Sequence, residues 1–240
     1  MLILNLGNFI VNNYVISLPE GYMLVDTGYE NGYNALCHKL AKNNIQLKDI
    51  HYIFLTHAHD DHAGFLNEFL SANTQTKVIL HPKAVAGLRR GQNSFEGGCS
   101  NRLAFLFCKA MALVGKKEHK FPMVNERFEE NYIFFDSPEA KKLEKQFSMK
   151  FIETPGHTDC SISLLWNDAI FCGDAAMNGM PSCNKITIWI ENLAEYQSLW
   201  KKIIELRPYM IYPGHGKPFA FRELSRNIEK INNRNLLPLF

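Results

Sequence analysis

Seven side chains that can bind a metal ion are distributed along this 240-residue chain in four short motifs. The first motif contains four of the seven, and each of the other three contains a single candidate ligand that directly follows a glycine. In chain order the seven are His57, His59, Asp61, His62, His157, Asp174 and His215. Imidazole and carboxylate groups are ligands that zinc, iron and manganese accept. Five imidazoles and two carboxylates suffice for two ions, so the sequence predicts a binuclear metal site.

The spacing inside the first motif predicts how its ligands divide between the two ions. His57 and His59 are two residues apart. In extended backbone their rings point to the same side, where both can meet one ion. Asp61 continues this alternation, and His62 breaks it, which requires the chain to turn. We therefore expect His57 and His59 to bind one ion, and Asp61 and His62 to bind the other.

Strand-like segments come shortly before the ligands, and a helix-like pattern follows several of them. The expected strands are 9–11, 14–18, 22–25, 50–55, 77–80, 132–135, 149–153, 161–166, 169–172 and 209–212. The expected helices are 31–44, 62–72, one from about 82, 193–206 and 221–233. Ligands that follow separate strands lie in loops that can converge at one edge of a sheet.

Composition and charge fit an ordinary globular protein. The chain is 46% hydrophobic and 21% charged, and its net charge is +2. That balance does not favour nucleic acid as a partner, so a small-molecule substrate is expected. No run of 18 apolar residues predicts a transmembrane helix, and no secretory signal is recognised. The six cysteines form no C-x-x-C pair and are expected to be reduced, which favours the cytoplasm.

Residues 91–130 interrupt the alternation of strands and helices. Their centre, Leu103–Val114, predicts a strongly apolar helix, and Lys116–Lys120 predicts a solvated charged run. We interpret the chain as one α/β domain over residues 1–240 with a helical cap inserted at about 91–130. The cap is expected to be a lid over the metals or a homodimer contact, and a lipid-facing role stays open.

The order of the motifs resembles the metallo-β-lactamase superfamily over roughly residues 8–220. The resemblance is carried by Val25-Asp26-Thr27-Gly28, the H-x-H-x-D-H cluster, Gly156-His157, Gly173-Asp174 and Pro213-Gly214-His215. It implies a four-layer αβ/βα sandwich with two zinc ions per chain, with iron or manganese as alternatives. The ligands implied are His57, His59 and His157 for the first ion, Asp61, His62 and His215 for the second, and Asp174 as a bridge. Asp26 is expected beside the site and not as a ligand.

The resemblance implies a metal-dependent hydrolase. We expect cleavage of an ester, thioester or lactone through a metal-bridging hydroxide, with Asp61 orienting the hydroxide and passing a proton to the leaving group. A phosphodiesterase is the second interpretation, and a binding protein with a metal site and little turnover is the third. True β-lactamases of the superfamily typically lack an aspartate at the bridging position, so Asp174 argues against antibiotic hydrolysis.

The remaining candidates for chemistry are assigned to structure. His38, His51, His81 and His119 lie outside the motifs and are expected to be packed or solvent-facing side chains. Cys172 adjoins Asp174, but the histidines that could activate a thiol are already assigned to metal. It is therefore expected to be a buried strand residue.

Overall fold

The computed structural model describes residues 2–94, 96–113 and 119–239, which belong to two compact units. Unit 1 comprises Met1–Asn93 and His119–Phe151, and unit 2 comprises Ser94–Glu118 and Ile152–Phe240. The chain leaves unit 1 after Asn93, returns at His119 and enters unit 2 again at Ile152. The expectation of a single domain with an insertion at about 91–130 stays a prediction.

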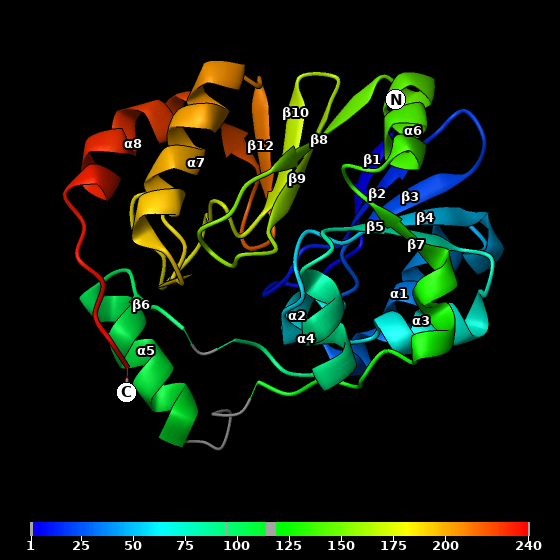
Figure 1. Cartoon of the computed structure of the whole chain (residues 1–240), viewed down its shortest axis with the longest axis horizontal. Helices are drawn as coiled ribbons and strands as arrows, with labels where there is room; N and C mark the ends of the chain where they lie inside the picture. Colours follow the sequence, from blue (N-terminus) through cyan, green and yellow to red (C-terminus); the bar gives the residue numbers. More distant parts are fainter. Residues whose placement is uncertain (1, 95, 114–118, 240) are drawn as a thin grey trace. The chain divides into compact units, whose positions relative to one another are not determined.

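Unit 1 is built on a mixed sheet with strand order β1-β2-β3-β4-β5-β7 among the described residues (Figure 1). The strands are β1 (Ile3–Asn5), β2 (Tyr14–Ser17), β3 (Tyr22–Val25), β4 (Ile50–Phe54), β5 (Lys77–Leu80) and β7 (Tyr132–Phe134). The pairs from β1 to β3 are antiparallel, and those from β3 to β7 are parallel. Parallel neighbours end at the same edge, which therefore gathers the segments that follow β3, β4 and β5.

The helices α1 to α4 of unit 1 lie in the connections between parallel strands, and α6 follows β7. They are α1 (Tyr33–Lys42), α2 (Asp60–Ala63), α3 (Leu66–Ala72), α4 (Ala84–Arg90) and α6 (Pro138–Phe147), with short 3-10 turns at Glu30–Gly32, Leu47–Asp49 and Glu126–Asn131. α1 buries Leu36 and Leu40, the two residues that are four apart on one helical face. α6 begins at a serine cap followed by proline, since Ser137 Oγ accepts a hydrogen bond from the Ala140 N–H.

Unit 2 has a sheet of order β13-β12-β10-β9-β8 and two helices that lie side by side along it (Figure 1). Its elements are β8 (Met149–Glu153, which begins in unit 1), β9 (Ile162–Trp166), β10 (Ala169–Gly173), α7 (Leu193–Leu206), β12 (Met210–Pro213), β13 (Phe219–Ala220) and α8 (Arg222–Asn232). The core places Tyr196, Trp200 and Ile203 of α7 against Leu224 and Ile231 of α8, and all five are fully buried. This packing fixes the helices against β10 and β12.

A two-stranded ribbon and one helix complete unit 2. The ribbon pairs β6 (Gly98–Cys99) with β11 (Trp189–Ile190) in antiparallel fashion. α5 (Arg102–Leu113) starts three residues after β6. The apolar helix predicted at Leu103–Val114 is thereby confirmed up to Leu113, whereas Val114 and residues 116–118 of the predicted charged run lie outside the described residues.

Two predicted elements differ from the structure. Residues 9–11 form no strand, because Asn8 Oδ1 accepts hydrogen bonds from the N–H groups of Ile10 and Val11 and turns the chain there. The single helix predicted at 62–72 is two helices, α2 and α3, with an interruption at Phe65, whose backbone is not helical. The start of α2 before His62 supplies the turn that the spacing of the ligands required.

Candidate metal centre

The first group of predicted ligands lies at the edge where β3 and β4 end. Val25 of β3 is paired with Phe54 of β4, so Asp26 and Thr56 follow their strands at the same edge. The Asp26 N–H donates to the Phe54 carbonyl at 3.1 Å. Asp26 adopts a left-handed backbone conformation with φ of 59°. A short polar residue tolerates that conformation better than a β-branched one, and it turns the carboxylate away from the strand direction.

The Asp26 carboxylate orients two of the predicted ligands. Its Oδ2 accepts from His62 Nδ1 at 2.8 Å and from the Thr56 hydroxyl at 2.8 Å, and its Oδ1 accepts from the Thr56 N–H at 2.8 Å. Because the Thr56 proton is given to Asp26, its oxygen accepts from His57 Nδ1, 3.0 Å away. Both rings therefore carry their proton on Nδ1 and present a basic Nε2. Asp26 thus lies beside the predicted ligands and bonds His62 directly, and its role as a support of metal ligands stays a prediction.

The four ligands of the first motif lie close together in unit 1. The ring centroids of His57 and His59 are 4.6 Å apart, and those of His57 and His62 are 4.1 Å apart. Ligand atoms of His57 come within 4.8 Å of those of His59 and of His62, and the same holds for Asp61 and His62. The three imidazoles are buried, and the Asp61 side chain retains 15% exposure.

The turn that carries these predicted ligands is hydrogen-bonded to Asn93, the last residue before the chain leaves unit 1. Asp60 N–H donates to Asn93 Oδ1 at 2.8 Å, and Asn93 Nδ2 donates to Asp60 Oδ1 at 2.7 Å. Main-chain hydrogen bonds join Asn93 to His119 and Phe121 to Gly91. We call residues 91–93 and 119–121 the neck. Asp60 is thus a structural residue that fixes the ligand turn to the neck.

The second group of predicted ligands lies in unit 2, again at the end of parallel strands. Gly173 of β10 is paired with Pro213 of β12, so Asp174 and His215 follow at one edge. Asp174 Oδ1 lies 3.5 Å from His215 Nε2, and its Oδ2 lies 3.7 Å from His157 Nε2. All three side chains are buried. Asp174 therefore faces an imidazole on each side, as a bridging ligand would.

The loop that presents His157 is fixed by main-chain groups. His157 Nδ1 donates to the Trp189 carbonyl of β11 at 2.8 Å, which directs its Nε2 toward Asp174. The preceding Gly156 has φ of 127° and accepts from the N–H groups of Glu191 and Asn192. Burial raises the pKa of the nearby Glu191 to about 7, against hydrogen bonds from Ser94 and the Asp159 N–H that lower it. The loop is thus pinned between the ribbon and the start of α7.

The distances between the ligand atoms fit metal coordination better than direct hydrogen bonding. The contacts of Asp61 with His62 and of Asp174 with His157 and His215 measure 3.5–3.7 Å, which is long for a hydrogen bond. Two ligands that each bind a tetrahedral zinc at about 2.0–2.1 Å are separated by about 3.4 Å. Together with the anchored Nδ1 atoms, these distances show that the His and Asp groups of both units are able to hold metal ions.

Two contributors to the centre were not predicted from the sequence. Thr56 directly precedes the first motif and was given no role, yet its hydroxyl links His57 to Asp26. The acceptor for His157 is the main-chain carbonyl of Trp189, which no side-chain pattern could reveal. A threonine directly before the motif, at the end of a buried strand, was the one available signal.

The residues set aside in the sequence lie where expected. His81 is buried but accepts a hydrogen bond from the Lys83 N–H at 3.0 Å and stacks on Phe135. Cys172 is buried in β10. His38 and His51 are exposed. His119 belongs to the neck, with its ring 3.5 Å from Asp60.

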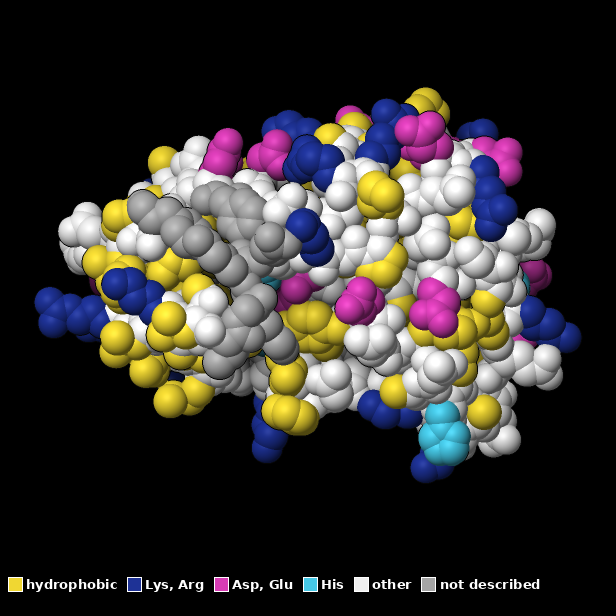
Figure 2. All heavy atoms as spheres, turned by 90° about the horizontal axis from the view of Figure 1, so that it is seen from below, with side chains coloured by type: hydrophobic (Ala, Val, Ile, Leu, Met, Phe, Trp, Pro, Cys, Tyr) yellow, Lys and Arg dark blue, Asp and Glu magenta, His cyan; other side chains and the backbone are white. Residues whose placement is uncertain are grey.

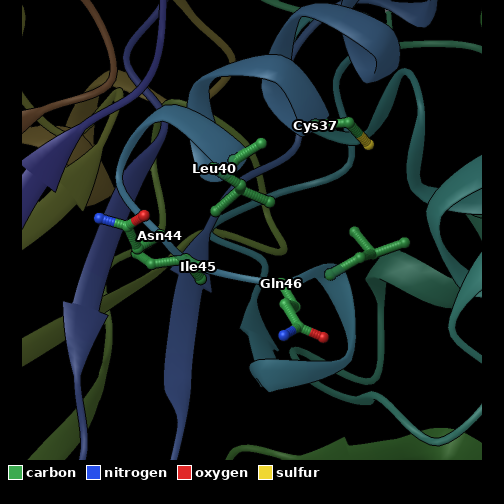
Figure 3. A pocket seen from close by; sticks show the side chains of 7 residues that line it. Cys37, Leu40, Asn44, Ile45 and Gln46 are labelled. Atoms are coloured by element: carbon green, nitrogen blue, oxygen red, sulfur yellow. The ribbon is translucent and has the colours of Figure 1, made fainter.

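A separate cavity in unit 1 has no such chemistry. It measures about 420 Å³ and lies between the end of α1 and the following 3-10 turn (Figure 3). Its lining residues are Cys37, Leu40, Ala41, Asn44, Ile45, Gln46 and Leu47. Cys37 is its sole titratable side chain, and none of the predicted metal ligands faces it. The metal centre is therefore the candidate for function.

Comparison with known families and proteins agrees with this chemistry. The profile of the metallo-β-lactamase superfamily matches residues 6–215. A β-lactamase-like protein 2 homolog of Caenorhabditis elegans is 28% identical over 228 residues, which is 93% of this chain and 61% of that protein. A probable metallo-hydrolase of Methanocaldococcus jannaschii is 27% identical over 211 residues, covering 86% of this chain and 87% of that protein.

Solved structures show the same fold. A metallo-β-lactamase superfamily protein of Sulfolobus tokodaii has a TM-score of 0.59 at 21% identity and covers 92% of this chain and 80% of its own. The Rm3 metallo-β-lactamase has a TM-score of 0.66 at 16% identity, covering 95% and 88%. These likenesses confirm the predicted α/β fold class of the superfamily, with mixed sheets and helices. Among the described residues, no helix is both long and apolar enough to cross a membrane.

The profile match spans most of the chain, and the matched range contains all seven predicted ligands. The chain therefore belongs to the metallo-β-lactamase superfamily, and its class is that of the metal-dependent hydrolases.

Proposed function

We propose that this protein uses two metal ions to hydrolyse an ester, thioester or lactone. The proposed ligands are His57, His59 and His157 for one ion and Asp61, His62 and His215 for the other, with Asp174 shared by both. Zinc suits this donor set, and iron or manganese is the alternative. The observation that carries the proposal is that Nδ1 of His57, His62 and His157 is engaged by the protein, which leaves Nε2 as the metal-binding atom.

Asp61 and Asp26 would have separate roles in the proposed reaction. Bound ions would supply a hydroxide at neutral pH and polarise the electrophilic oxygen of the substrate. Asp61 is the carboxylate with residual exposure, so one of its oxygens can hold the proton of the attacking water and pass it to the leaving group. Asp26 is fully engaged by Thr56 and His62, and its role is to hold ligands.

Two features favour acyl substrates over the alternatives. Asp174 faces two imidazoles, and true β-lactamases of the superfamily typically lack an aspartate at that position. The net charge of +2 provides no broad basic field for a polyanionic substrate. A small ester, thioester or lactone therefore fits best.

The ligand assignment is tested by metal analysis of purified protein. We expect two ions per chain in the wild type and a loss of at least one in the variants His57→Ala and His157→Ala. The matched control is His38→Ala, which removes an exposed histidine of α1 and should leave the metal content unchanged. Equal metal content in all four proteins would overturn the assignment.

The reaction is tested with the metal-loaded protein on p-nitrophenyl esters, thioesters, lactones, bis-p-nitrophenyl phosphate and a chromogenic β-lactam. We expect turnover of an acyl substrate, and a fall in kcat of about 100-fold or more in Asp61→Asn. Turnover of the phosphodiester alone would refute the acyl assignment. Loaded protein that turns over none of them would favour a binding role.

A further inference from the structure

Helix α5 exposes four of its large apolar side chains. Within Arg102–Leu113 only Ala104 is buried. Leu106 is 63% exposed and Leu113 is 88% exposed, with Leu103 and Phe107 at about 40%. A helix that packs on a core normally turns its large apolar residues inward. In α5 the small Ala104 is the buried residue and Phe105 and Met111 are half-buried, whereas Leu103, Leu106, Phe107 and Leu113 face solvent.

The exposed side chains form one continuous face. Leu103, Leu106, Phe107, Ala110 and Leu113 follow the spacing i, i+3, i+4, i+7 and i+10, which places them on the same side of a helix. Figure 2 shows hydrophobic side chains gathered at the left of the view, where α5 lies. The face is thus a continuous apolar surface and not a set of scattered residues, and such surfaces mark sites of interaction.

Basic residues border this face. Arg102 and Lys109 are exposed and lie along one edge of it, and Lys109 Nζ is 4.6 Å from the centre of the Phe105 ring. Residues 97–117 contain four basic residues and no aspartate or glutamate. An apolar helical face with a basic edge is complementary to a surface that is apolar inside and negatively charged outside.

We propose that α5 docks onto the surface of an anionic lipid bilayer, with Leu106, Phe107 and Leu113 inserted among the acyl chains and Arg102 and Lys109 against the headgroups. The helix has 12 residues, too few to span a bilayer, and suits a position in the plane of the interface. This inference goes beyond the proposed function, because it concerns a surface that contains none of the metal ligands.

A second copy of the chain fits this face less well than a lipid surface. Pairing through α5 would bring two segments together that carry only positive charge between residues 97 and 117. Like charges at such a contact repel, whereas the headgroups of anionic lipids attract both basic side chains. The charge pattern therefore favours an anionic bilayer over a second copy of the chain as the binding partner of α5.

The test is co-sedimentation of the purified full chain with vesicles of phosphatidylcholine alone and of phosphatidylcholine with 30% phosphatidylserine. We expect binding to the anionic vesicles, and partition reduced about tenfold or more in Leu106→Ser/Leu113→Ser and in Arg102→Glu/Lys109→Glu. Arg102→Lys/Lys109→Arg should restore wild-type partition. The matched control is Tyr209→Ser, which removes an apolar side chain that is 74% exposed elsewhere in unit 2.

Three results would overturn the proposal. One is equal sedimentation with and without vesicles. Another is vesicle binding that all four variants retain. The third is a dimer, detected by analytical ultracentrifugation, that the Leu106→Ser/Leu113→Ser variant dissociates while no protein binds vesicles. Metal content and ester turnover are measured on the same preparations, so a failure of lipid binding is distinguishable from a failure of the hydrolase assignment.

Discussion

Asp26 shows how a residue that is not itself a predicted ligand can orient the ligands of a candidate metal centre. One carboxylate accepts the proton of His62 directly and holds the Thr56 hydroxyl that accepts the proton of His57. Both rings are thereby fixed in orientation and in tautomer before any ion arrives. Pre-organised ligands lose less conformational freedom on binding, which strengthens metal affinity.

Thr56→Val is expected to weaken metal binding about 10- to 100-fold, because the acceptor for His57 Nδ1 and a donor to Asp26 are lost together. The measurement is a competition titration of the metal against a chromophoric chelator. The matched control is Thr187→Val in unit 2, a buried threonine whose hydroxyl has no hydrogen-bond partner among the described residues. Equal affinities in both variants would contradict the role given to Thr56.

Sequence reasoning identified the ligand candidates but not everything that orients them. The types and spacing of the seven ligands could be extracted from the motifs, and Asp26 followed from the family resemblance. Thr56 could not be assigned a role, since its hydroxyl could point to either side of the strand. The Trp189 carbonyl is a main-chain group that every residue possesses, so its role depends on the pairing of β11 with β6.

At the scale of elements, the ends of parallel strands explain where the ligands lie. β3 and β4 carry Asp26 and the first motif, whereas β10 and β12 carry Asp174 and His215. The sequence predicted these strands well because each is a short, mainly apolar run with at least two buried residues. It was wrong at residues 9–11, where two local hydrogen bonds from the N–H groups of Ile10 and Val11 to Asn8 Oδ1 outweigh strand propensity.

Gly156→Ala is expected to displace the His157 loop. A methyl group there would lie 2.4 Å from the Tyr196 nitrogen of α7, and φ of 127° is unfavourable for alanine. We expect a loss of stability of roughly 2 kcal/mol or more together with lower metal content, measured by thermal unfolding and metal analysis. Gly179→Ala is the control, because its methyl group would approach only the Gly216 Cα, at 3.7 Å. Similar stability and metal content in both variants would show that the loop tolerates the displacement.

At the scale of the whole molecule, the proposed ligands are divided between the two units. Unit 1 supplies His57, His59, Asp61 and His62, and unit 2 supplies His157, Asp174 and His215. Neither unit holds the complete set that the proposed function requires. On that proposal, metal binding depends on both units being folded, and it stabilises them jointly.

Removal of metal with a chelator is therefore expected to lower the thermal midpoint by about 5–10 °C, given that saturation at 100 times the Kd contributes about 2.7 kcal/mol. Differential scanning calorimetry before and after chelation, and again after addition of zinc, measures the change and its reversal. The His57→Ala variant should respond much less to chelation. Identical curves for wild type with and without chelator would contradict the coupling.

The neck suggests how the chain could diversify. Its two sides are joined by main-chain hydrogen bonds between Gly91 and Phe121 and between Asn93 and His119, while Asn93 fixes Asp60 beside the ligands. Main-chain bonding is indifferent to side-chain identity. The part of residues 94–118 that follows β6 could therefore be exchanged for a loop of another length, while β6 still pairs with β11 and the turn that carries the predicted ligands keeps its support. Evolution could thus change the surface that this segment offers to a binding partner without changing the predicted metal ligands.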